Sequence, residues 1–233
     1  MTHGALQDRL QSNSEASTIP EDVLRYPDSR GTPELRTAIC DLLQRTTMEG
    51  LGPAPENLLL SVGVSSVLDN LFFLLADDGA SCLVAAPYYP MFDQDLGLRA
   101  NVRPRPIYFS DATADSTVLD VEFRAAQSAR QPVRAVMLTN PDNPTGVLMS
   151  DERIKGVMRW CVRKRVHCVI DEVYAWSVFP EAGPMRSALT LAADLAAELS
   201  DSDQEHLWAH VHIVIGLSKD FCMSGAIPHD QCL

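Results

Sequence analysis

Long apolar runs are missing from this sequence of 233 residues. The longest one, Leu71–Ala76, is far shorter than the roughly 20 apolar residues that a membrane-spanning helix needs. The first twenty residues hold no apolar stretch of the kind found in secretory signals. We therefore expect no membrane partner, and we expect a cytoplasmic location by default.

Positive charge is also scarce. Lys and Arg number 19 against 31 Asp and Glu, so the formal net charge is −12. Such a chain repels a phosphate backbone unless a local basic patch overcomes the net charge. Residues 99–105 and 159–165 are the two candidate patches, but both interleave their charges with apolar residues, as amphipathic surface elements do. The sequence therefore predicts no nucleic-acid partner.

Cysteine pairs at metal-ligand spacing are absent as well. The six cysteines include no C-x-x-C pair, and His167, next to Cys168, is the one histidine adjacent to a cysteine, so we expect reduced core thiols and no metal site. What the chain does have is ordinary: 46% hydrophobic and 21% charged residues, close to the averages of soluble globular proteins. A chain of this length folds as one large domain or two small ones.

Apolar strands alternate with helices along the chain. Expected strands are residues 58–62, 81–85, 102–108, 135–138, 166–170 and 211–217. Expected helices are residues 33–48, which Thr32 caps, and 65–75, 91–98, 120–130, 151–165 and 188–199, and residues 201–205 are expected to form an acidic loop. This alternation predicts an α/β fold with a parallel sheet and right-handed crossovers.

Polar features follow four of the predicted strands, and ligands of open α/β sheets gather at strand carboxyl ends. Gly63 lets backbone N–H groups approach an anion at a helix start. Asp171, at the end of an apolar strand, needs a cation to stay ionised. Lys219 follows an equally apolar strand, where an amine can form a Schiff base. Asn143, with its neighbouring prolines, is the fourth polar feature. The phosphate cradle, the carboxylate and the lysine together describe a pyridoxal phosphate site.

Three motifs, in a fixed order, carry a family resemblance. They are Asn140–Gly146 (NPDNPTG), Asp171–Tyr174 (DEVY) and Ser218–Asp220 (SKD). With Tyr26–Arg36 before them, they resemble the class I/II aminotransferase family of fold-type-I pyridoxal phosphate enzymes, over about residues 24–225. The resemblance implies the three-layer α/β/α large domain of that fold type, built on a mostly parallel sheet. The segment Pro87–Asp93 looks most like the branch of the aminocyclopropane-carboxylate synthases.

The resemblance implies catalytic roles for three residues. Lys219 would bind pyridoxal 5′-phosphate covalently and would move a proton at the substrate's Cα. Asp171 would pair with the protonated pyridine nitrogen. Tyr174, together with Asn143, would hydrogen-bond the phenolic oxygen of the ring.

The remaining cofactor contacts are implied in the same way. Tyr89, which fits better than its neighbour Tyr88, would stack on the ring face. The phosphate would be held by Gly63, Val64 and Ser65, and Tyr26 would reach the phosphate of the other subunit in a homodimer. Each of these residues also has an ordinary structural explanation, as a core aromatic, a turn residue or a helix cap.

The sequence departs from the family pattern near its end. Gly216 stands where a phosphate-binding Ser is usual, and Ile227 stands where the family has a phosphate-binding Arg. We therefore expect residues 25–225 to form the cofactor-binding large domain, between a polar segment at residues 1–24 and a divergent tail at residues 226–233. The family's small domain, with its substrate-binding Arg, is expected to be missing, and turnover to be impaired.

These observations favour a pyridoxal-phosphate-dependent enzyme of the aminotransferase type, acting on amino-acid and 2-oxo-acid substrates. Two alternatives within the fold are a lyase of the aminocyclopropane-carboxylate-synthase kind and a catalytically inactive cofactor-binding fragment. A nucleotide-binding module built on Gly63 and its helix is a further alternative, but the sequence has no Walker or dinucleotide fingerprint.

Overall fold

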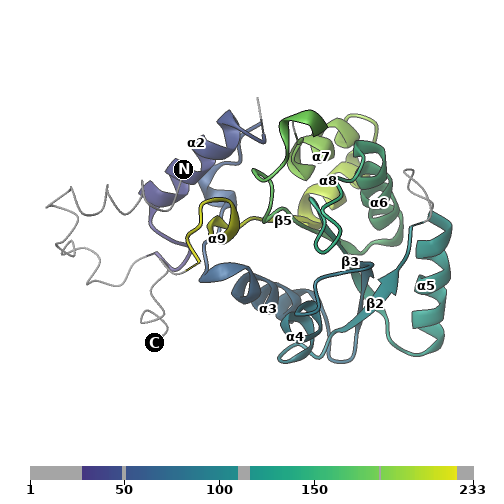
Figure 1. Cartoon of the computed structure of the whole chain (residues 1–233). Coiled ribbons are helices and arrows are strands. Elements are labelled where there is room, and N and C mark those ends of the chain that lie inside the picture. Colours follow the sequence, from purple (N-terminus) through teal and green to yellow (C-terminus); the bar gives the residue numbers. More distant parts are fainter. Residues whose placement is uncertain (1–27, 49–50, 110–115, 184, 225–233) are drawn as a thin grey trace, which may run out of the picture.

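A parallel sheet of five strands lies at the centre of the part of the chain that the structure, a computed structural model, describes: residues 28–48, 51–109, 116–183 and 185–224 (Figure 1). The strands are β1 (Ser81–Ala85), β2 (Arg103–Ile107), β3 (Val133–Thr139), β4 (His167–Asp171) and β5 (Val211–Val214). The α-helices are α2 (Pro33–Arg45), α3 (Gly63–Leu75), α4 (Phe92–Gly97), α5 (Ser116–Ser128), α6 (Asp151–Lys164), α7 (Ala188–Ala196), α8 (Asp201–His210) and α9 (Leu217–Asp220), with short 3₁₀ turns η3 (Pro55–Asn57) and η4 (Pro180–Ala182).

The strand order, β2-β1-β3-β4-β5, shows where the sheet can bind a ligand. All neighbouring strands are parallel. The chain adds β2 on one side of β1 and then adds β3 on the other side, so the direction of strand addition reverses at β1. Ligands of open α/β sheets bind outside the carboxyl ends of the strands at such a reversal.

Side-chain alternation along the strands divides the core into two layers. In β4, Val169 faces α3 and α4, whereas Cys168 and Ile170 face the helices α5 to α8. Figure 1 shows α3 and α4 on one side of the sheet and α6, α7 and α8 on the other. This arrangement confirms the predicted three-layer α/β/α fold, because a sheet buried on both faces needs helices on both.

The helix α2 lies outside these layers and packs on a third apolar cluster. Its start is as predicted: Pro33 is the first helical residue, and Leu35 N–H donates to Thr32 Oγ1 at 3.4 Å. Its buried side chains, Ile39 and Leu43, contact residues from other parts of the chain. Those partners are Leu58, Leu60, Trp176, Leu189, Ile213 and Ile215. α2 therefore stands next to the loop that follows β4.

Two expectations about secondary structure are wrong. Residues 58–62 form no strand; Leu60 N–H donates to Arg30 O at 2.9 Å, and Leu58 and Leu60 pack under α2 rather than in a sheet. Residues 201–205 are not a loop but the start of α8, where Ser200 Oγ accepts a hydrogen bond from Asp203 N–H. Acidic residues stabilise a helix N-terminus, so the acidic run fits a helix start.

The end of the sheet also differs from the expectation. The strand β5 ends at Val214, and Lys219 lies on the one-turn helix α9 instead of directly after a strand.

Within the described ranges, no helix is both long enough and apolar enough to span a membrane.

Candidate functional site

The carboxyl ends of β3, β4 and β5 lie in register. Thr139 pairs with Asp171, and Asp171 pairs with Val214. Asn140 N–H donates to Asp171 O at 2.9 Å, and Glu172 N–H donates to Val214 O at 2.7 Å, so the strand pairing extends one residue further. The segments that leave these strands therefore start side by side. They carry Asn143, Tyr174 and Lys219.

Asp171 is a buried carboxylate with little to neutralise it. It follows Val169 in the alternation of β4 and therefore faces the side of the sheet that α3 and α4 cover. The residue is 4% exposed and accepts a hydrogen bond from Val173 N–H at 3.1 Å. No ion pair among the described residues includes Asp171. Burial raises the pKa of Asp171 to about 7 against the effect of that hydrogen bond, and the Asp95 charge raises it further.

Glu172, the next residue, is a buried carboxylate that sequence reasoning gave no role. It faces the opposite side of the sheet, where it accepts hydrogen bonds from Ser187 Oγ at 2.8 Å and from Ala188 N–H at 2.6 Å. Burial raises its pKa to about 7 as well, although both hydrogen bonds lower it. Glu172 therefore holds the start of α7. The sequence could have indicated this, because consecutive residues of a strand point to opposite faces, so Glu172 cannot share the site of Asp171.

Tyr174 and Asn143 come together, as the resemblance implies. Asn143 Nδ2 donates to the hydroxyl of Tyr174 at 3.4 Å, a long hydrogen bond. Burial raises the pKa of Tyr174, and the negative charge of Asp171 and the nearby Tyr89 and Asp220 raise it further. These groups therefore act on one another through space at one edge of the sheet.

The turn that carries Asn143 is fixed from within. Asn140, which is 1% exposed, accepts a hydrogen bond from Met149 N–H at 2.8 Å. Asp142 accepts a hydrogen bond from Thr145 N–H at 3.2 Å and another from the Thr145 hydroxyl. The predicted turn at residues 140–146 thus holds the amide of Asn143 in place at the end of β3.

The two tyrosines after β1 face different surroundings. The hydroxyl of Tyr88 donates to Asp93 at 3.0 Å, its ring packs on the core beneath α3 and α4, and burial raises its pKa to about 12. Tyr89 is 37% exposed, and its ring meets Phe92 edge-on with 5.5 Å between the ring centroids. The preference for Tyr89 over Tyr88 as the ring-stacking residue is consistent with this exposure.

The start of α3 has an open backbone at Gly63. Its φ of +75° belongs to the left-handed region, and a Cβ at this position would meet nothing within 4 Å. An anion can therefore approach the first N–H groups of α3. Ser65, two residues on, is exposed, and its hydroxyl hydrogen-bonds the Asp95 carboxyl.

Gly216 packs against the same helix start. A Cβ on Gly216 would lie 2.9 Å from Val64 Cγ2 and 3.1 Å from Val173 Cγ2. The Ser that is usual in the family at this position would clash with Val64 and crowd Val173. The departure noted in the sequence thus has a physical reason, since Val64 occupies the space of a side chain at residue 216.

Lys219 is exposed on α9, so the apolar surroundings expected from the preceding strand are not found among the described residues. Trp176 N–H donates to Asp220 Oδ2 at 3.0 Å, which attaches α9 to the turn after β4. Tyr26 and Ile227 lie outside the described residues, so the contact expected of Tyr26 stays a prediction.

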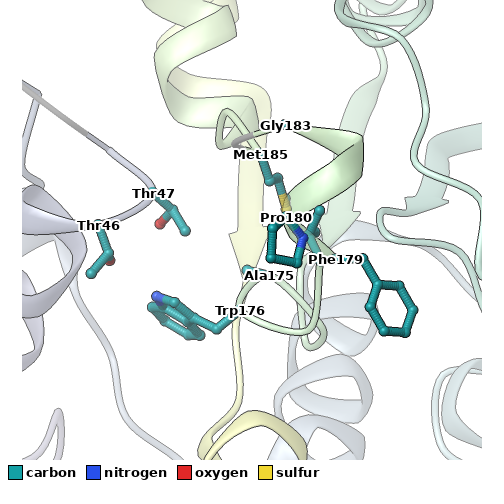
Figure 2. A pocket seen from close by; sticks show the side chains of 9 residues that line it. Thr46, Thr47, Ala175, Trp176, Phe179, Pro180, Gly183 and Met185 are labelled. Carbon is teal, nitrogen blue, oxygen red and sulfur yellow. The ribbon is translucent and has the colours of Figure 1, made fainter.

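Two cavities open near this edge. Figure 2 shows one of about 300 Å³, whose walls include Thr47, Trp176 and Met185, between the end of α2 and the loop after β4. The other, about 330 Å³, is lined by Asn143 and Tyr174, together with apolar residues of the same loop. The second cavity thus adjoins the candidate site.

The residues present fit pyridoxal phosphate on two grounds. Asp171 is a buried carboxylate that a ligand cation would stabilise, and Gly63 offers open backbone N–H groups to a phosphate. Val64, next to Gly63, belongs to the apolar cluster on the face of the sheet toward which Asp171 points. The carboxylate and the open backbone therefore lie on the same side of the sheet.

Comparison with known families gives one matching model. The model described as "Aminotransferase class I and II" matches residues 2–227. Among curated relatives, a 1-aminocyclopropane-1-carboxylate synthase of Vigna radiata is 30% identical over 97% of this chain and 62% of its own length. Another, from Cucurbita maxima, is 29% identical over 94% of this chain and 47% of its own length. The chain thus spans about half to three fifths of the length of these relatives.

Solved structures share the fold. An archaeal alanine:glyoxylate aminotransferase is 19% identical, with a TM-score of 0.71 over 93% of this chain and 48% of its own. A Thermus thermophilus aspartate aminotransferase is 24% identical, with a TM-score of 0.69 over 96% of this chain and 50% of its own. At these identities the likeness concerns the fold.

Proposed function

Because the chain belongs to the class I and II aminotransferase family, which uses pyridoxal 5′-phosphate, we propose that its candidate site binds this cofactor and acts on amino acids by transamination. The observation that carries the proposal is Asp171, a carboxylate 4% exposed with no cationic partner in the described part of the chain. A protonated pyridine nitrogen supplies the missing cation, because an opposite charge favours the ionised carboxylate.

Each remaining residue has a defined task in this proposal. Tyr174 and Asn143 would hold the phenolic oxygen, and they already hydrogen-bond each other. Tyr89 would cover the ring face. The N–H groups of Gly63, Val64 and Ser65 would hold the phosphate at the start of α3, with Ser65 Oγ exchanging its Asp95 partner for the ligand.

Lys219 has the central chemical task. Its Nζ would bind the cofactor covalently and, once displaced by substrate, would take the proton from the substrate's Cα and return a proton during transfer of the amino group. When bound, pyridoxal phosphate withdraws electrons from the attached amino acid and makes this Cα–H bond acidic. The exposure of Lys219 leaves its side chain free to reach a ligand on the Asp171 face. A homodimer in which Tyr26 serves the partner subunit belongs to the same proposal.

Reductive labelling tests the proposed function. The protein is incubated with pyridoxal phosphate, reduced with borohydride and mapped by peptide mass spectrometry. We expect the pyridoxyl group on Lys219 and its loss in Lys219→Ala. Lys155 and Lys164, both on α6, serve as internal controls. Labelling of these lysines alone would contradict the proposal.

A lyase function is the second candidate, favoured by the 1-aminocyclopropane-1-carboxylate synthases among the curated relatives. Both reactions begin with removal of the Cα proton, and they differ in whether an amino group is transferred or a leaving group expelled. Product analysis with S-adenosylmethionine, set against an amino acid plus a 2-oxo acid, separates them. Cofactor labelling without either product would indicate a cofactor-binding chain without turnover.

A further inference from the structure

We propose that Asp220 is a positioning residue, whose carboxylate fastens the turn carrying Lys219 to the turn carrying Tyr174. The inference rests on the proposed function for those two residues. It adds Asp220 as a residue that sets the distance between Lys219 and Tyr174.

The carboxylate of Asp220 bridges two chain segments far apart in sequence. Trp176 N–H donates to Oδ2 at 3.0 Å, and the Ser177 hydroxyl donates to Oδ1. Each carboxylate oxygen therefore has its own donor, and both donors belong to the turn directly after Tyr174. A charged acceptor with two donors makes stronger hydrogen bonds than a neutral one.

A ring contact supports the same junction. The rings of Phe221 and Trp176 meet edge-on, with 5.3 Å between centroids and 70° between planes. Trp176 itself belongs to the apolar cluster beneath α2. The residue next to Asp220 is thus attached to a part of the fold that the core holds in place.

The helix α9 needs this support because it is a single turn. It comprises four residues, and Phe221 N–H closes it with a hydrogen bond to Leu217 O at 3.2 Å. Isolated turns of this length are unstable in water, because nucleation costs more than one hydrogen bond returns. The orientation of Lys219 therefore depends on what α9 is attached to, and the attachment runs through Asp220 and Phe221.

The charge of Asp220 also reaches the site. Together with Asp171 from β4 and Tyr89 from the segment after β1, it raises the pKa of Tyr174, while Asn143 lowers it. Asp220 is also the immediate neighbour of Lys219. Removing the Asp220 carboxylate would change the electrostatics around Tyr174 as well as the geometry of the junction.

Two substitutions separate the charge of Asp220 from its hydrogen bonds. Asp220→Asn keeps one acceptor oxygen and a similar volume but removes the charge, and Asp220→Ala removes both. Asp203→Ala is the matched control: Asp203 also accepts hydrogen bonds from a serine hydroxyl, Ser200 at 3.1 Å, and from a second donor, Arg165 at 2.9 Å. It lies on α8, away from the carboxyl edge of the sheet.

The first measurement uses the cofactor-free protein. Hydrogen exchange of the Trp176 amide is expected to accelerate on the order of tenfold in Asp220→Ala, less in Asp220→Asn, and not at all in Asp203→Ala. Unchanged exchange in Asp220→Ala would overturn the inference, because the hydrogen bond would then not hold the junction together.

The second measurement adds pyridoxal phosphate. We expect the rate of borohydride-trapped attachment at Lys219 to fall on the order of tenfold in Asp220→Ala and less in Asp220→Asn. The pKa of the Tyr174 hydroxyl should fall in both variants, because both lack the Asp220 charge that raises it. Faster amide exchange with an unchanged attachment rate and an unchanged Tyr174 pKa would overturn the positioning role. Absence of labelling in the wild-type chain would instead contradict the proposed function, so the two failures are distinguishable.

Discussion

The two ends of β4 carry titratable groups whose pKa values are shifted in opposite directions. The strand begins at His167 and ends at Asp171. At the amino end, four histidine rings contact one another, with one stacked and two tilted pairs: His167, His206, His210 and His212. Burial lowers the pKa of His167 and of His212 to about 4, so these rings are neutral at pH 7. At the carboxyl end, burial raises the pKa of Asp171 to about 7.

The two ends of β4 differ in whether the titratable groups have partners within the protein. His167 Nδ1 and His212 Nε2 lie 3.0 Å apart and share a hydrogen bond, so one nitrogen of each neutral ring has its partner in the other ring. In the described part of the chain, no group of three His, Cys, Asp or Glu residues is arranged to hold a metal ion. Asp171 has a backbone donor and no described cation. Neutral histidines need no counter-charge and can serve the fold alone, whereas a buried carboxylate without a counter-charge indicates a ligand site.

Glu172 lies next to Asp171 but has hydrogen-bond partners within the fold, so replacing it tests the distinction between a structural carboxylate and a ligand-binding one. Its replacement is expected to have the largest effect on stability. Glu172→Ala leaves Ser187 and Ala188 N–H without their acceptor and opens a buried space. We expect the free energy of unfolding to fall by about 3 kcal/mol. Denaturant unfolding measures it, and Glu172→Gln, which keeps an acceptor oxygen, should lose less. An unchanged midpoint in Glu172→Ala would show that the start of α7 does not depend on this carboxylate.

Asp171→Asn should show the reverse pattern. Asn fills a similar volume but cannot accept the charge-assisted hydrogen bond from a protonated ring nitrogen, which contributes about 2 kcal/mol. We expect affinity for pyridoxal phosphate to fall on the order of 30-fold, while stability stays the same or rises, because a buried carboxylate without a counter-charge is removed. Spectroscopic titration with cofactor checks the first part and thermal unfolding the second. Loss of stability with unchanged affinity would reverse the roles of Asp171 and Glu172.

Gly216→Ser tests the close packing at the same edge. The added Cβ meets Val64 at 2.9 Å and Val173 at 3.1 Å, and such overpacking costs about 1–2 kcal/mol of stability. Val64→Ala removes the closer clash, so the double variant should recover part of the loss. Strictly additive losses in the unfolding curves would contradict the contact.

The smallest effect at neutral pH concerns the histidines. Their pKa values of about 4 in the folded protein lie below the usual value of about 6.5. Between these values the unfolded chain binds more protons, so stability should fall as the pH drops from about 6.5 to 4. Asp171 and Glu172 both have pKa values raised to about 7 and act with the opposite sign, so their contribution falls as the pH rises towards 7 and offsets that of the histidines. The histidine contribution is therefore the difference between two pH profiles of unfolding: replacing His167 and His212 by Gln should raise stability at pH 4 relative to pH 7, compared with the unchanged chain, and an unchanged profile would contradict the assignment.

Much of the fold could be predicted because local signals and tertiary packing agree. The apolar strands 81–85 and 166–170, the Thr32 cap and the proline turn at residues 140–146 all appear as expected. The prediction for residues 58–62 was wrong because a short apolar run has the same sequence pattern whether it pairs in a sheet or packs under a helix. The prediction of a loop at residues 201–205 was wrong because serine and aspartate favour both loops and helix starts.

The candidate site was predictable in its residue types but not in its packing. The order of motifs indicated Asp171, Asn143, Tyr174 and Lys219, and the first three lie at one edge of the sheet. The exposure of Lys219 and the contact of Gly216 with Val64 depend on side chains brought together from distant segments. Periodicity along the sequence carries no information about such contacts.

The most direct test is the ionisation of Asp171 itself, followed by carbon-13 NMR of labelled aspartate carboxyls and assigned with Asp171→Asn. In the cofactor-free protein we expect a midpoint near the value of about 7 that burial produces. With pyridoxal phosphate bound, the ring's positive charge should move this midpoint well below that value. A midpoint that does not change when the cofactor binds would contradict the claim that Asp171 is the partner of the ring nitrogen.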